Sequence, residues 1–394
     1  MKKNYWIFAA AAVALAACSN DDTIENAAFS ESNAINIQPF VGSVTRATDA
    51  TSSTLASFTV DAYKTGTFGN TPVNYFADVE FSKVNTSQTY TSTSKYYWPS
   101  DYNLDFFAYG YANEINTGIT KDASNQFTVI TNSDADDQVD LVYARTENWG
   151  KATGAASGHA IPGDNAGAVL NFRHAQSQII VQLKNSNSNL KVTVNGVRVG
   201  NLVDRGQVTI SDGDTDGNND NTTSYVLSSA AWDTNITGAT VATYDVEATA
   251  ATVATSSAVQ AGKSLILIPQ ALATPATTYE GTGTPKEYTK PYILVDLKIQ
   301  NNKEGEAGAY IVGAASGNNE YITAMWPLPE LTWAAGYKYI YTVDLAGGGY
   351  YPENNTGDDQ LDPILAGAEI KFVDVTVDEW ENSVQTDITN TPNP

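Results

Sequence analysis

Short runs of apolar residues, many of them alternating with polar ones, recur along the chain from Leu55 onward. Clusters of Gly, Asn, Asp, Ser and Pro separate the runs and are typical of turns. No window of helical length shows a 3.6-residue period. The pattern predicts strands at 58–63, 79–84, 104–111, 127–130, 139–144, 169–172, 179–183, 190–199, 264–268, 293–299, 337–345 and 370–377. Many short strands without intervening helices predict an all-β protein made of sandwiches or barrels.

A Gly- and Ala-rich span at residues 150–167 interrupts the strands and offers a domain boundary. Two stretches in the second half, 212–223 and 239–261, are polar or rich in Ala and Thr, and we expect them to be long loops. The expected globular parts are an N-terminal β domain at 47–167, a C-terminal β domain at 168–380 and a polar tail at 381–394.

The chain opens with the features of an export signal. Two lysines precede an apolar run at residues 6–17, which is shorter than the ~20 residues of a membrane-spanning helix. The run ends in LAAC, whose last residue, Cys18, is the one cysteine of the sequence. LAAC resembles the lipobox of bacterial lipoproteins, which implies that residues 1–17 are removed and that Cys18 is acylated. The alternative is an ordinary signal peptide followed by a free thiol, which is unusual in an exported chain.

A strand-like segment and one basic residue follow. Ile35 and Ile37 alternate with polar residues, and Pro39 would confine such a strand to a sheet edge or a bulge. The next basic residue is Arg46, in a stretch rich in Thr, Ala and Ser. An isolated arginine in an exposed loop is a ready site for a trypsin-like protease, which would cut between Arg46 and Ala47. The alternative is a surface arginine with no role in processing.

The charge balance narrows the range of partners. The sequence holds 21 Lys and Arg against 44 Asp and Glu, and removal of the signal with its two lysines leaves 19 minus 44, or −25. So acidic a chain repels phosphate backbones, which excludes nucleic acid as an expected partner. Catalytic side chains are scarce, because the two histidines, His159 and His174, stand in no recognised catalytic motif. We therefore expect no enzyme activity, and His174 is expected to pack or hydrogen-bond at a strand.

One loop has the spacing of a calcium-binding loop. Four aspartates occupy positions 1, 3, 5 and 9 of that pattern: Asp212, Asp214, Asp216 and Asp220. Gly217 stands at position 6, but Thr223 replaces the glutamate of position 12, and no helical pattern flanks the loop. The loop is therefore either a calcium site or a solvated acidic hairpin, and no other cofactor is expected.

Five blocks rich in aromatic or apolar residues occur in order: YYWPSDYNLDFFAYGY, FRHAQSQIIVQL, LILIPQ, WAAGYKYIYTVDL and IKFVDVTVDEW. Together with the lipobox and Arg46, this ordered set closely resembles the fimbrillin family of Bacteroidetes, the lipoprotein pilins of type V pili, over almost the whole chain. The resemblance implies two tandem transthyretin-like β-sandwich domains. It also implies export as an acylated precursor to the outer membrane and cleavage by an arginine-specific protease, which removes the first strand with residues 18–46.

The resemblance implies assembly by β-strand donation. A strand removed from a sandwich leaves a groove of unpaired backbone groups and apolar core, which a segment of another subunit fills. The candidate donor is the C-terminal strand, whose apolar residues Ile370, Phe372, Val375 and Val377 are expected on one face. The alternative is that this is only the last strand of its own domain.

We therefore expect a structural or accessory subunit of a fimbria, exposed at the cell surface. Its expected partners are other fimbrial subunits, an arginine-specific protease and, through the lipid anchor, the outer membrane. The alternative is a surface-exposed lipoprotein that binds glycans through stacking on exposed Trp and Tyr side chains.

Overall fold

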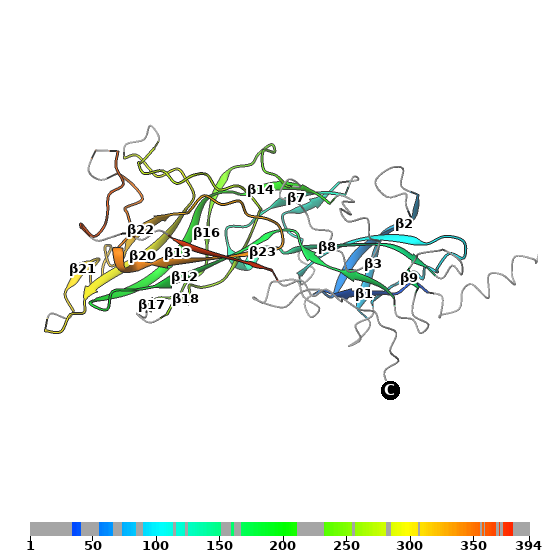
Figure 1. The fold of residues 1–394 in the computed structure, drawn as a ribbon, viewed down its shortest axis with the longest axis horizontal. Coiled ribbons are helices and arrows are strands. Elements are labelled where there is room, and N and C mark those ends of the chain that lie inside the picture. The colour runs from blue at the N-terminus through cyan, green and yellow to red at the C-terminus, as the bar shows by residue number, and fades with distance from the viewer. Residues whose placement is uncertain are drawn as a thin grey trace, which may run out of the picture.

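The structure is a computed structural model of the 394-residue chain. It describes residues 34–40, 55–65, 73–83, 90–112, 116–122, 125–150, 159–160, 167–210, 232–253, 257–280, 285–305, 308–354, 357, 359–367, 370 and 373–380. These residues form two lobes that lie end to end, with the strands of the N-terminal half at one end and those of the C-terminal half at the other (Figure 1). Among the described residues, no helix has the length and apolar character needed to cross a lipid bilayer.

The N-terminal lobe is built on one sheet, here called sheet I. Its strand order is β10-β1-β4-β3-β2-β5-β8-β11, and β9 pairs with β8. The strands are β1 (Ile37–Phe40), β2 (Ser57–Lys64), β3 (Asn74–Lys83), β4 (Tyr90–Ser92), β5 (Leu104–Tyr111), β8 (Leu141–Gly150), β9 (His159–Ala160), β10 (Ala168–Asn171) and β11 (Arg173–His174). Sheet I curls, because β10 contacts β8 although β1 to β5 lie between them in the strand order. Both ends of the sheet therefore share one core.

The C-terminal lobe is a sandwich of two sheets. Sheet III has the order β16-β13-β20-β21, with β17 and β22 attached, and sheet IV has the order β18-β12-β23-β24, with β19 attached. The strands of sheet III are β13 (Leu190–Val203), β16 (Val241–Asp245), β17 (Ala251–Thr252), β20 (Tyr292–Asn301), β21 (Tyr310–Val312) and β22 (Ile322–Pro327). Those of sheet IV are β12 (Ser177–Lys184), β18 (Val259–Gln260), β19 (Leu265–Leu267), β23 (Tyr337–Asp344) and β24 (Asp374–Glu379).

The core between sheets III and IV follows from strict alternation along the strands. In β20 the residues Ile293, Val295, Leu297 and Ile299 are buried and their neighbours are half-buried. In β23 the inward residues are Tyr339, Tyr341 and Val343. Side chains two residues apart lie on the same face of a strand, so each strand turns one apolar row toward the other sheet.

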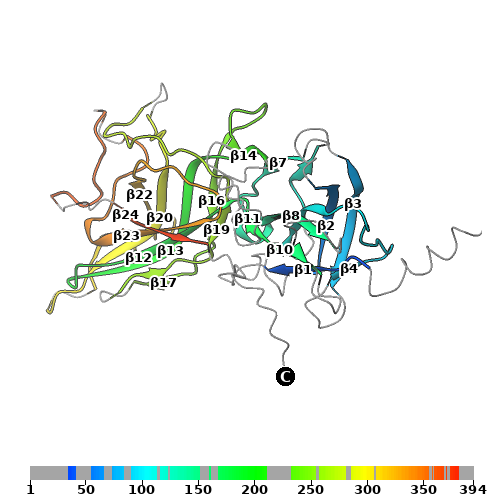
Figure 2. The same ribbon diagram turned by 45° about the vertical axis from the view of Figure 1, so that its right-hand side comes forward.

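A fourth sheet, sheet II, joins the two lobes. Its order is β15-β14-β7-β6, from β6 (Ile119–Lys121), β7 (Gln126–Ile130), β14 (Arg205–Thr209) and β15 (Trp232–Asp233). The strands β6 and β7 come from the N-terminal half of the chain, while β14 and β15 come from the C-terminal half, and the views place this sheet at the junction (Figures 1 and 2). Beneath it lies a core shared by both halves, with Phe127, Leu141 and Tyr143 packed with Val208 and Trp232.

Much of this architecture agrees with the sequence-based expectation. The all-β prediction is confirmed, and each of the expected strands has a counterpart in the described residues. The described residues contain no α-helix, and their 3₁₀ turns include η3 (Ala135–Asp137) and η5 (Leu345–Gly347). The boundary at residue 167 stays a prediction. Strands β10 and β11, which follow that boundary, pair with β1 and β8 of sheet I.

The stretch 239–261 differs from the expectation of a long loop. It contains β16, β17 and β18, which pair with β13 and β12. Val241 and Val259 in these strands are 61% and 54% exposed. Backbone hydrogen bonds can hold a strand at the edge of a sheet without a row of buried apolar side chains. The sequence of such a strand then lacks the alternation of apolar and polar residues from which strands are predicted.

Candidate functional site

Strand β1, the expected removable strand, lies inside sheet I. It pairs in parallel with β10 from Ile37 opposite Ala168 to Phe40 opposite Asn171, and it pairs antiparallel with β4 at Ile37 opposite Tyr90. Figure 2 shows β1 between β10 and β4 at the lower side of the N-terminal lobe. Removal of β1 would therefore break pairing on both of its sides.

The residues just before β1 extend its contacts. The backbone N–H of Ile35 donates to the carbonyl of Tyr96 at 2.8 Å, and that of Ala168 donates to the carbonyl of Asn36 at 2.9 Å. Ala34 also forms a β-bridge with Tyr97. The seated segment is therefore longer than β1 and runs from Ala34 to Phe40.

Alternate side chains of this segment enter the core of the N-terminal lobe. Ile35 and Ile37 are 2% and 0% exposed, and Pro39 is also buried. Each fully buried isoleucine contributes roughly 1.5–3 kcal/mol to the free energy of unfolding. The expectation from Pro39 needs correction, because β1 is not an edge strand. Among the described residues, β4 pairs with β1 only at Ile37. The strand ladder between β1 and β4 therefore does not extend to Pro39, whose nitrogen has no hydrogen to donate.

Aromatic rings form the core that receives β1. The ring of Phe58 lies 5.0 Å from that of Tyr90 and 5.0 Å from that of Phe172, in tilted and edge-on arrangements. All three belong to the same core as Ile35 and Ile37. The Tyr90 hydroxyl donates to the carbonyl of Leu55 at 2.5 Å, and burial raises the pKa of Tyr90, which keeps the hydroxyl neutral as a donor.

One glycine allows β1 to lie against β10. A Cβ atom at Gly167 would lie 1.9 Å from the carbonyl oxygen of Asn36 and 2.5 Å from the nitrogen of Ile37. No side chain fits in that space, since real Cβ contacts are not shorter than about 3 Å. Sequence reasoning assigned Gly167 to a linker and missed this role, although a glycine at the start of a strand is a signal of close backbone approach.

The candidate donor strand, β24, pairs with β23 of its own chain. The ladder is antiparallel and runs from Tyr337 opposite Glu379 to Thr342 opposite Asp374. Among the described residues β24 has no partner on its other side, so it is the edge of sheet IV. An edge strand is attached through one ladder only, which makes it easier to detach than an interior strand.

The side chains of the C-terminal segment are less buried than expected. Val373 is 6% exposed, while Ile370 and Val375 pack partly against the core. Val377 is 45% exposed, so the expected apolar face does not reach Val377. Phe372 lies outside the described residues.

A buried tryptophan holds the end of β24. The side chain of Trp380 is 0% exposed, and its ring stacks on His174 with centroids 3.8 Å apart and an angle of 3° between the planes. Nδ1 of His174 lies 3.0 Å from both carboxylate oxygens of Asp140, which is fully buried. The backbone N–H of Trp380 donates to Gly336 at 2.9 Å. The end of the last strand is thus fixed at the junction of the lobes, and His174 packs and hydrogen-bonds as expected.

Several predicted site residues lie outside the described part of the chain. These are Cys18, Arg46, Ala47 and the four aspartates Asp212, Asp214, Asp216 and Asp220. Their roles stay predictions.

One acidic cluster that sequence reasoning missed joins Asp134, Asp136 and Glu247, whose carboxylate oxygens lie within 4.8 Å of one another. The ammonium group of Lys263 forms ion pairs with Asp136 and Glu247. The ammonium group of Lys263 offsets part of the negative charge of the three acids, so the group is best described as an ion-pair network. The members are far apart in sequence, and no local spacing marks them.

Comparison with known protein families gives a match to a family described as fimbrillin-like, over residues 45–380. That range covers most of the chain. The chain belongs to the fimbrillin-like family.

One solved structure resembles this fimbrillin-like chain in fold, and two others match most of its length with lower scores. A fimbrial protein from Bacteroides vulgatus matches with a TM-score of 0.51 at 15% identity, covering 88% of this chain and 99% of that chain. A Bacteroides uniformis protein proposed to act in cell adhesion matches with a TM-score of 0.38 at 16% identity, covering 88% of this chain and 98% of that one. A similar protein from Bacteroides ovatus gives 0.42 at 14% identity, with 90% and 99% covered. No curated protein sequence matches the chain.

Gly167→Ala should strain the seat of β1 in the fimbrillin-like chain. A methyl group would collide with the backbone at Asn36 and Ile37, so the free energy of unfolding should fall by several kcal/mol. Urea unfolding would measure the loss. The matched experiment places the same substitution in a chain that starts after Arg46, where the collision is absent and the loss should shrink below about 1 kcal/mol. Equal losses in both chains would contradict the contact.

Trp380→Ala should loosen β24 without disturbing β1. The substitution removes a fully buried ring, which typically destabilises by about 3–5 kcal/mol. Hydrogen exchange followed by mass spectrometry should show faster exchange across β24 and unchanged exchange across β1. Val377→Ala, at an exposed site of the same strand, is the control and should change little. Unchanged protection of β24 in Trp380→Ala would show that the ladder with β23 alone holds the strand.

Proposed function

We propose that this fimbrillin-like protein is a structural or accessory subunit of a cell-surface fimbria. In this proposal it is exported as a lipoprotein precursor, cut after Arg46 and assembled with other subunits by β-strand donation. The observation that carries the proposal is the position of β1, which lies inside sheet I and precedes Arg46 in the sequence. Membership of the fimbrillin-like family supports the fimbrial role and the surface location.

Cleavage after Arg46 would separate β1 covalently from the rest of the lobe. If β1 then leaves, β10 loses a parallel partner, β4 loses a bridge, and the places of Ile35 and Ile37 in the core open to water. Two buried isoleucines account for roughly 3–6 kcal/mol of burial at the usual magnitude. The cut subunit would therefore become more stable when it accepts a new strand.

The donor in this proposal is β24 of another subunit. Its segment presents Val373, Val375 and Val377 at the two-residue spacing with which Ile35, Ile37 and Pro39 occupy the core. Because β24 is an edge strand, its release breaks one ladder and withdraws Trp380 from His174. The contact joins two different surfaces of the subunit. When the rotation between successive subunits does not close a ring, repetition of this contact generates a filament.

Two variants should fail at opposite ends of this contact. Arg46→Ala should keep β1 in place and accept no donor, whereas Val375→Asp should accept a donor but supply none, because a carboxylate in an apolar groove costs several kcal/mol. After limited digestion with trypsin, neither variant alone should polymerise, and an equal mixture should form pairs and nothing longer. Mass photometry would measure the species. Arg46→Lys, which trypsin also cuts, is the control for Arg46→Ala and should polymerise like the wild type.

Long polymers from undigested Arg46→Ala protein would contradict the proposal. So would normal polymers from Val375→Asp, since they would require a different donor. Val259→Asp places a carboxylate at an exposed position of sheet IV and should assemble normally.

Cys18→Ser should remove the lipid anchor. Acylation needs the thiol, and cleavage of a lipobox signal normally follows acylation, so the variant should stay as unprocessed precursor. Labelling with a radioactive fatty acid, followed by fractionation of membranes, would test this. Fatty-acid label on the Cys18→Ser protein would contradict the lipobox.

A further inference from the structure

Sheets I and II meet at a lysine and a buried aspartate. Lys121 ends β6 of sheet II, and Asp61 lies in β2 of sheet I. Nζ of Lys121 lies 3.9 Å from Oδ2 of Asp61, and the two side chains are 15% and 4% exposed. An ion pair with so little exposure loses much of the hydration energy of its two charges. The pair is therefore a candidate for a reaction that removes both charges.

A second carboxylate lies next to the same lysine. Oδ1 of Asp78, in β3, lies 3.2 Å from Nζ of Lys121, and the Asp78 side chain is 69% exposed. Asp78 has a φ of +52°, which is uncommon outside glycine, and β2 and β3 change register between Val60 and Ala62. Such a backbone conformation persists only where the surrounding structure holds it. Here it turns the backbone N–H of Asp78 toward Asp61 and its carboxylate toward Lys121.

Two hydrogen-bond donors hold the carboxyl group of Asp61. The backbone N–H of Asp78 donates to Oδ1 at 2.6 Å, and the Tyr63 hydroxyl donates to Oδ2 at 3.3 Å. Burial raises the pKa of Asp61, which favours its neutral acid form, and it raises the pKa of Tyr63 to about 12, which keeps the hydroxyl protonated. An N–H group fixed at a carbonyl oxygen stabilises the oxyanion that forms when a nucleophile attacks the adjacent carbon. Asp61 is thus placed as an electrophile beside an amine.

We propose that Lys121 and Asp61 join in an isopeptide bond that forms without another enzyme. The carboxylate of Asp78 accepts one proton from the ammonium group of Lys121, and the neutral amine attacks Cγ of the Asp61 carboxylic acid. Nζ loses a second proton to the Oδ2 hydroxyl, which leaves as water when the Cγ–Oδ2 bond breaks, and the amide keeps the third proton. Asp78 is largely exposed and passes its proton to solvent.

The folded chain supplies what this reaction lacks in water. An ammonium group and a carboxylate in water do not condense readily, because hydration stabilises both charges. Folding has already removed much of that hydration at Asp61, and it holds the two groups in contact, so that they react as parts of one molecule. The bond joins β2 to β6 and so links sheet I to sheet II covalently.

Peptide mapping of the full chain tests the proposal. After folding and then denaturation, trypsin should release Asp61 in the peptide 47–64 and cut after an unmodified Lys121. Trypsin does not cut after an acylated lysine, so the isopeptide bond should instead give residues 47–64 linked to residues 96–145, lighter than their sum by one water molecule. Tandem mass spectrometry would locate the link. Lys298, whose Nζ lies 2.6 Å from the more exposed Glu320, is the internal control and should keep its amine.

Two variants test the assigned roles. Lys121→Arg keeps the positive charge and removes the nucleophile, so the linked peptide should be absent. Asp78→Asn keeps the backbone N–H and removes the base, so linkage in a pulse-labelled chain should slow about a hundredfold. The proposal fails if the folded wild-type chain gives only the unlinked peptides, because Lys121 and Asp61 then form an ion pair and nothing more. It also fails if Lys121→Arg gives the linked peptide, and the role of Asp78 fails if Asp78→Asn links at the wild-type rate.

Discussion

The pairing of β1 with β10 is the contact on which the N-terminal lobe depends. A parallel strand inside a sheet satisfies backbone groups on its neighbours and fills the core beneath them, and β1 does both with a four-residue strand. The close approach of Gly167 makes the contact a steric match as well as a hydrogen-bonded one. β1 is buried in the core of the lobe, and in the sequence it lies close to Arg46. That combination underlies the proposed exchange of this strand during assembly.

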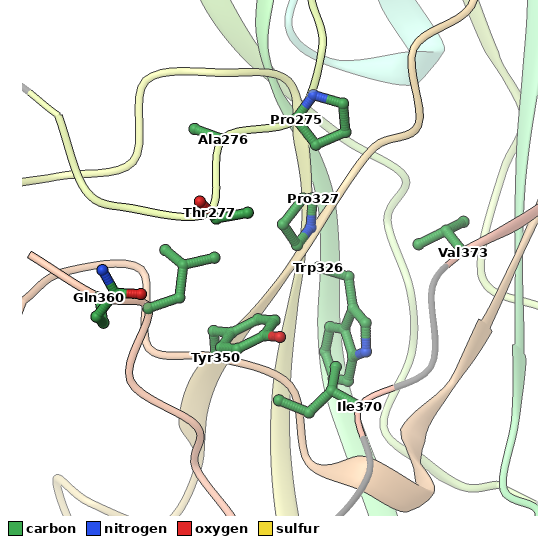
Figure 3. Close-up of a pocket in the computed structure, with 10 residues that line it drawn as sticks. Pro275, Ala276, Thr277, Trp326, Pro327, Tyr350, Gln360, Ile370 and Val373 are labelled. Atoms are coloured by element: carbon green, nitrogen blue, oxygen red, sulfur yellow. The ribbon is translucent and has the colours of Figure 1, made fainter.

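The two ends of the folded chain are held in different ways. β1 is fixed along its length by neighbours and core, whereas β24 has one ladder, a partly exposed face and a terminal anchor at Trp380. Trp380 stacks on His174, which contacts Asp140 at the junction of the lobes. The position of the last strand therefore depends on both halves of the chain. The same segment also supplies Ile370 and Val373 to an apolar pocket of about 450 Å³ in the C-terminal lobe (Figure 3). One segment of the chain therefore forms both a wall of this pocket and strand β24.

The sequence alone was sufficient where side-chain burial sets the pattern. β20 alternates so regularly that its buried face can be read from the sequence, and the all-β class follows from many such runs. The sequence was insufficient where backbone geometry determines which segments pair. β16 to β18 are held by backbone pairing with few buried side chains, and Gly167 looks like any other linker glycine until β1 lies on it. The stack of His174 on Trp380 joins distant parts of the chain, and neither residue's neighbours in sequence indicate the other.

Sheet II has a mechanical consequence for the whole molecule. Its central ladder, from Ile130 opposite Arg205 to Gln126 opposite Thr209, ties a strand of one half of the chain to a strand of the other. The covalent connection between the lobes therefore does not carry a pulling force by itself, since several backbone hydrogen bonds share the load. A subunit with this sheet resists stretching and bending at the junction of the lobes better than one whose lobes are connected by the covalent chain alone.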